Sequence, residues 1–147
     1  MKIIVKDIEY DDVEYIGCAG LPSYPVCFKA KHFEGWARFV PFSENLEKYI
    51  DEQVGVEVAC EKVTDFSVGE FLNEKIENLP EKYCYAVCGR VTEIAHHSQP
   101  VGNKTIYITS HDAEFSLSWL DIGDCDIKKG DIVTFNIHGL SLWDEMI

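Results

Sequence analysis

The chain has 147 residues, of which 46% are hydrophobic, 12% aromatic and 27% charged. This composition excludes a disordered chain and predicts a globular unit that buries roughly two-thirds of the surface of its unfolded chain. Lys and Arg number 13 against 26 Asp and Glu, so the net charge is -13. Such a charge repels nucleic acid and anionic lipid headgroups and attracts basic partners.

The N-terminal sequence and the cysteines indicate the compartment. No stretch reaches the ~20 apolar residues that span a bilayer, and charges at Lys6 and Asp7 interrupt a secretory signal pattern. We therefore expect a cytoplasmic protein of one compact domain over 1–147. Its six cysteines are expected to be reduced and mostly buried.

Short apolar segments separated by turn residues fill the first half of the chain. Period-two alternation predicts strands, and a Ser before a helical stripe predicts a helix start. In chain order we expect a hairpin of 2–8 and 13–18, a loop over 17–25, strands over 26–32 and 36–42, a helix over about 44–53 and a strand over 56–63.

A second helix is predicted over about 68–79. Ser67 and Glu70 have the spacing of a capping box, and Phe66 and Phe71 have that of a hydrophobic staple. Pro80 would end this helix because proline cannot continue the hydrogen-bond ladder.

Strand patterns dominate the second half of the chain. We expect a long strand over 83–94 with a bulge or bend at Gly89, then strands over 104–110, 114–120 and 131–138. A partial echo links 60–66 with 88–94, but nothing else aligns at that spacing, so it predicts shared strand chemistry and not a repeat.

A long strand bent at a glycine, a hairpin and a Lys-Lys-Gly-Asp turn before a final strand resemble the OB-type small barrel. We therefore predict a β-rich α+β fold: a small OB-like antiparallel barrel or strongly bent sheet over about 83–143, extended by N-terminal hairpins, with two short helices. The alternative is a mixed α+β sheet with both helices on one face.

The barrel resemblance implies a ligand face on its second and third strands. Those strands would present Tyr107 among hydroxyl side chains, with one ring and no cation. Because cations supply most of the affinity for nucleic acid, nucleic-acid binding is disfavoured. Tyr and hydroxyl groups suit a protein contact better.

Acidic residues near both ends of the chain are the other candidate contacts. They could attract a basic protein partner by electrostatic steering. The predicted partner-binding residues are Asp11, Asp12, Glu14, Tyr107, Trp143, Asp144 and Glu145.

The sequence contains no recognisable motif for catalysis or metal binding. Cys84 and Cys88 would lie ~13 Å apart along an extended strand, too far to share a zinc ion, and His96 and His97 precede a predicted loop. No cysteine has a local histidine signature, and Cys18, in a glycine-flanked loop, is the best candidate for a reactive thiol. We therefore predict no catalytic residue, no metal and no cofactor.

The leading functional hypothesis is an acidic protein-binding module, such as an immunity or antitoxin-like inhibitor of a basic partner. One alternative is an OB-like module that binds single-stranded nucleic acid or a saccharide. The other is an enzyme whose active site carries no readable motif.

Overall fold

The computed structural model describes residues 1–69 and 73–147. The described part is strand-rich, with one short α-helix and one 3-10 helix. Its elements in chain order are β1 (Lys2–Ile8), β2 (Glu14–Ile16), β3 (Leu21–Ala30), β4 (Glu34–Val40), η1 (Leu46–Tyr49), β5 (Gln53–Ala59), β6 (Lys62–Gly69), β7 (Lys75–Asn78), β8 (Tyr85–His96), β9 (Lys104–Ser110), β10 (Ala113–Ser118), α1 (Trp119–Ile122), β11 (Ile132–His138) and β12 (Ser141–Asp144). Neither helix is long and apolar enough to cross a membrane.

The first sheet closes into a five-stranded barrel. Its ring runs β1, β5, β12, β4, β3 and back to β1, and β2 pairs with the start of β3 outside the ring. All pairings are antiparallel except that of β12 with β4. With η1 between β4 and β5, this strand order resembles that of an OB-type barrel.

The second sheet repeats the same strand order, although its fifth strand, β6, precedes the other four in the chain. β8, β9 and β10 form a meander, α1 follows, and β11 returns to pair with β8. β6 then pairs with β11, in the position that β12 occupies beside β5. Between β6 and β10 no pairing is recorded among the described residues, and α1 contacts both strands.

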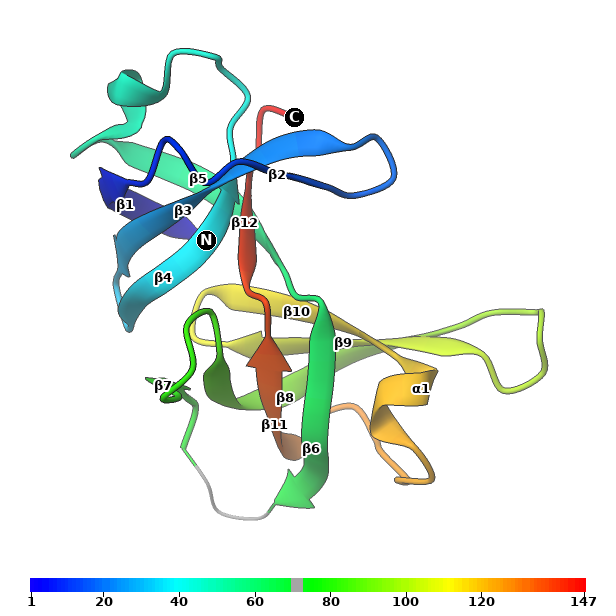
Figure 1. Cartoon of the computed structure of the whole chain (residues 1–147). Coiled ribbons are helices and arrows are strands. Elements are labelled where there is room, and N and C mark those ends of the chain that lie inside the picture. Colours follow the sequence, from blue (N-terminus) through cyan, green and yellow to red (C-terminus); the bar gives the residue numbers. More distant parts are fainter. Residues whose placement is uncertain (70–72) are drawn as a thin grey trace.

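The two sheets exchange their fifth strands. β6 follows β5 after Cys60 and Glu61 but joins the second sheet, and β12 follows β11 after Gly139 and Leu140 but joins the first. Figure 1 shows the two connections passing in opposite directions between the units. Each unit is therefore completed by a strand of the other half of the chain.

Side chains at the junction join the two units. Leu140 is fully buried, its N–H donates to the Tyr83 carbonyl at 3.0 Å, and its own carbonyl accepts from the Arg38 N–H at 2.9 Å. The Tyr85 hydroxyl donates to the Trp36 carbonyl at 2.7 Å, and its ring meets Phe33 edge to face. Burial raises the pKa of Tyr85.

The predicted β-rich fold with a small OB-like barrel or bent sheet is confirmed, and the closed ring lies in the first sheet. The four strands predicted in the second half are found within two residues of their predicted bounds, with Val133, Phe135 and Ile137 buried on one face. The bulge in β8 falls between Val91 and Glu93, whereas Gly89 allows close approach of β9.

The helix predicted over 68–79 is wrong where the chain is described, because Val68 and Gly69 end β6 and residues 75–78 form β7. Ladder pairing with β11 overrides the local capping pattern; Glu70 and Phe71 lie outside the described residues. The helix predicted over 44–53 shortens to η1.

The predicted N-terminal hairpin is also wrong, because β1 and β2 both pair with β3 and not with each other. β3 begins at Leu21, inside the predicted loop. Along this edge of β3, the pairing with β2 ends at Ser23 and the pairing with β1 begins at Val26. Pro25 lies between these two ladders, so its missing N–H interrupts neither of them.

The exchange predicts that the last strand stabilises the first barrel. Leu142 is fully buried on β12, opposite Phe39 of β4 and Val58 of β5. Leu142→Ala should lower the free energy of unfolding in urea by about 2–5 kcal/mol, because it leaves a cavity between these strands. Leu120→Ala, on a side chain that is 74% exposed, should change it by no more than about 0.5 kcal/mol. Equal effects of the two variants would contradict this placement.

Candidate functional site

Residues 9–16 follow β1 in the chain and precede the turn into β3. They form an exposed acidic arm beside the first barrel (Figure 1). The acidic arm carries four carboxylates between apolar and aromatic side chains. Tyr15 is 72% exposed, Tyr10 47% and Val13 38%. Its exposed acidic residues are Glu9, Asp11, Asp12 and Glu14.

A buried arginine holds the acidic arm in place. Arg38, on β4, is 6% exposed, and its guanidinium donates to the backbone carbonyl of Asp12 at 2.8 Å and to that of Ser23 at 2.6 Å. The Ser23 hydroxyl donates to the Glu14 carbonyl at 2.7 Å. These bonds fix the backbone of the arm, and the same guanidinium lies 3.6 Å from an Asp12 carboxylate oxygen and 3.9 Å from a Glu14 carboxylate oxygen. The rings of Tyr10 and Tyr15 remain exposed to a partner.

The predicted C-terminal contacts lie on the first barrel in different environments. The Trp143 ring packs against Gly17, in the turn that follows the acidic arm. Asp144 is buried, and its carboxylate accepts from the Tyr49 hydroxyl at 2.8 Å and from the Met146 N–H at 3.0 Å. Glu145 is exposed beside Gly55.

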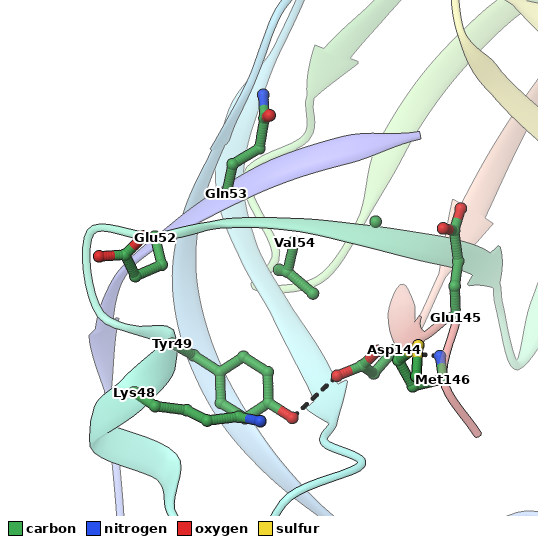
Figure 2. Close-up of a pocket in the computed structure, with 9 residues that line it drawn as sticks. Lys48, Tyr49, Glu52, Gln53, Val54, Asp144, Glu145 and Met146 are labelled. Carbon is green, nitrogen blue, oxygen red and sulfur yellow. Dashed lines mark hydrogen bonds between the residues drawn. The ribbon is translucent and has the colours of Figure 1, made fainter.

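Figure 2 shows the surface pocket, of about 320 Å³, that Asp144, Glu145 and Tyr49 line. Burial raises the pKa of Tyr49; backbone hydrogen bonds oppose this rise, and Asp144 adds to it. Because the Asp144 carboxylate already accepts hydrogen bonds from Tyr49 and Met146, it supports the C-terminal residues.

Tyr107 lies in the other unit. It sits on β9 opposite Ser116 of β10 and Glu93 of β8, and it is half-buried. The structure thus brings Asp11, Asp12 and Glu14 together in the acidic arm, places Trp143 under the adjoining turn, and leaves Tyr107 on a separate sheet.

A second surface lies on the outside of β1, β3 and β4. Lys6, Lys29 and Trp36 line a shallow depression of about 680 Å³. The Lys82 ammonium lies 4.3 Å from the Trp36 ring centroid. Lys6 is paired with Asp51 and Lys82 with Glu9. Sequence reasoning placed the ligand face on the other sheet and missed this one.

A third group of polar side chains lies at the junction. The Cys84 Sγ is 3.4 Å from His138 Nδ1 and 3.9 Å from a Glu81 carboxylate oxygen. Burial raises the pKa of the Cys84 thiol; a backbone hydrogen bond from Gly139 opposes this rise, and Glu81 adds to it. Sequence reasoning tested Cys84 with its neighbours in the chain and missed His138, which lies 54 residues away.

No protein-family model matches the chain, and no curated protein or solved structure matches it significantly.

The environment of Cys84 predicts its reactivity. Glu81→Gln removes the carboxylate that helps raise the pKa of this thiol, so the thiolate fraction at pH 8 should increase. We expect alkylation of Cys84 by iodoacetamide to become about two- to fivefold faster, measured by mass spectrometry of the Cys84 peptide. Glu114→Gln, an exposed change on β10, should leave the rate unchanged. A slower or unchanged rate in Glu81→Gln would show that the carboxylate does not act on the thiol.

Proposed function

We propose that this protein is an acidic protein-binding module that occupies a basic surface of its partner through the acidic arm, in the manner of an immunity or antitoxin-like inhibitor. The observation that carries the proposal is the arm itself: two exposed tyrosines and an exposed valine among four carboxylates, on a backbone fixed by Arg38.

The chemistry of the acidic arm suits a protein interface. Exposed Tyr side chains supply large contact areas at little conformational cost, and tyrosines are frequent among the residues that carry binding energy. The surrounding carboxylates would speed capture of a basic partner. Because Arg38 holds the arm in place before binding, association requires little further ordering.

The net charge of -13 supports the same partner class. It acts over the whole molecule, whereas the acidic arm supplies the local contacts. The two contributions are separable, since charge can be changed elsewhere on the surface without touching the arm.

The test is capture of a partner from lysate of the source cells at low salt, followed by affinity measurement with the captured protein. Tyr15→Ala should weaken binding by at least tenfold, because an exposed ring at the contact is lost. Asp11→Asn with Asp12→Asn should mainly slow association and reduce its salt dependence.

The control is the pair Glu93→Gln and Glu114→Gln, which makes the same change in net charge on exposed sites of the second sheet. This pair should bind nearly as the unmodified protein does. If it loses as much affinity as the Asp11 and Asp12 pair, charge alone and not the acidic arm determines binding.

A second candidate function rests on the outer face of β1, β3 and β4. Trp36 offers a ring for stacking, and Lys29 makes no ion pair with any described residue. This face combines an aromatic ring with cations, as surfaces that bind single-stranded nucleic acid do. The overall charge opposes such binding.

Fluorescence anisotropy with a labelled single-stranded oligonucleotide tests the second candidate. If the face binds, Trp36→Ala should reduce the affinity by about 5- to 100-fold, the loss expected for one stacked base. Trp119→Ala, on α1 of the other unit, should not. No binding by the unmodified protein at physiological salt would remove this candidate.

A further inference from the structure

Three potential metal ligands converge where the two units meet. Glu81 and Cys84 belong to the turn before β8, and His138 is the last residue of β11. Their ligand atoms all lie within 4.8 Å of one another, and no other such group of His, Cys, Asp and Glu side chains is found in the described residues. They come from segments 54 residues apart, so the fold and not local sequence assembles them.

The separations fit one tetrahedral zinc ion. With a Zn–S bond of about 2.3 Å and a Zn–N bond of about 2.0 Å, tetrahedral geometry separates sulfur and nitrogen by about 3.6 Å. The Cys84 Sγ and His138 Nδ1 are 3.4 Å apart. The Glu81 oxygen, at 3.9 Å from Sγ, belongs to an exposed side chain that can move the few tenths of an ångström required.

The backbone fixes the two inner ligands. The Cys84 N–H donates to the Glu81 carbonyl at 3.2 Å, which closes the turn that carries both residues. The His138 carbonyl accepts from the Glu61 N–H at 3.0 Å, on the opposite crossing connection. Cys84 is 6% exposed, so its sulfur is held in position before any metal binds.

The histidine ring is also oriented. His138 Nε2 lies 2.8 Å from the Thr64 hydroxyl on β6. One tautomer satisfies the hydrogen bonds of the Thr64 hydroxyl, the His138 ring and the Cys84 thiol together. In it, Nε2 carries the proton and donates to the threonine, and the Nδ1 lone pair faces Cys84. Metal-binding histidines typically donate a hydrogen bond from the ring nitrogen that does not bind the metal.

We propose that Cys84, His138 and Glu81 form a zinc site, with the fourth position open to a water molecule on the side of the exposed Glu81. One thiolate, one imidazole and one carboxylate are ligands of the kinds that zinc takes. The ion would join the turn before β8 to the end of β11, at the point where the chain crosses between units. The site is independent of the acidic arm.

Cobalt titration of the full chain, under reducing conditions, tests this site. Co²⁺ replaces Zn²⁺ in such sites and gives a thiolate-to-metal absorption band only when sulfur binds. We expect one equivalent of Co²⁺ to produce the band, and Zn²⁺ but not Mg²⁺ to abolish it. Cys84→Ser should remove the band, whereas Cys88→Ser, a buried thiol on β8 outside the cluster, should retain it.

Two further variants keep the test decisive if Cys84→Ser fails to fold. Glu81→Gln alters an exposed side chain, and Thr64→Val removes the hydroxyl beside His138; each should weaken cobalt binding by about 10- to 100-fold while the band remains detectable at high metal concentration. The proposal is overturned if the unmodified protein gives no thiolate band, if the band persists in Cys84→Ser, or if Glu81→Gln and Thr64→Val leave the affinity unchanged.

Discussion

The rest of the structure depends on the exchange of β6 and β12. Each strand forms an antiparallel ladder with the last long strand of the other half, β6 with β11 and β12 with β5. β12 also closes the first barrel by its parallel pairing with β4. Because each unit takes a strand from the other, neither half of the chain can complete its own sheet, and the two units are expected to unfold together.

The functional candidates lie beside the exchanged strands. The antiparallel pairing of Ile137 with Tyr85 in the second sheet brings the adjacent residues His138 and Cys84 together, and β11 leads out of that sheet at this point. The same crossing carries Trp143 into the first barrel, where its ring supports the turn after the acidic arm. The acidic arm projects from the barrel that β12 closes, and its contacts to Arg38 use the strand beside β12.

The local sequence pattern was sufficient to locate most strands in the second half of the chain. It was insufficient to predict which strands pair with each other. Alternation along 104–110 and 131–138 identifies strands because one face is buried, as at Ile106 and Ile108. It does not identify the neighbour of each strand, which is why an N-terminal hairpin was wrongly predicted and the exchange was missed. The capping pattern at Ser67 predicted a helix that ladder pairing overrides. The structural repeat was missed as well: β5 and β11 begin at 53 and 132, and β6 and β12 at 62 and 141, with little shared sequence. Among the candidate contacts, the acidic arm could be found from its charges alone, whereas His138 could not be linked to Cys84 without the fold.

The most direct test of the account is a set of backbone nuclear Overhauser effects from residues 141–144 and 62–69 in solution. The exchanged arrangement predicts contacts of 141–144 with 56–59 and of 62–69 with 132–138. Contacts of 62–69 with 53–59, together with contacts of 141–144 with 132–138, would instead show two tandem units that each keep their own fifth strand, and would contradict the account.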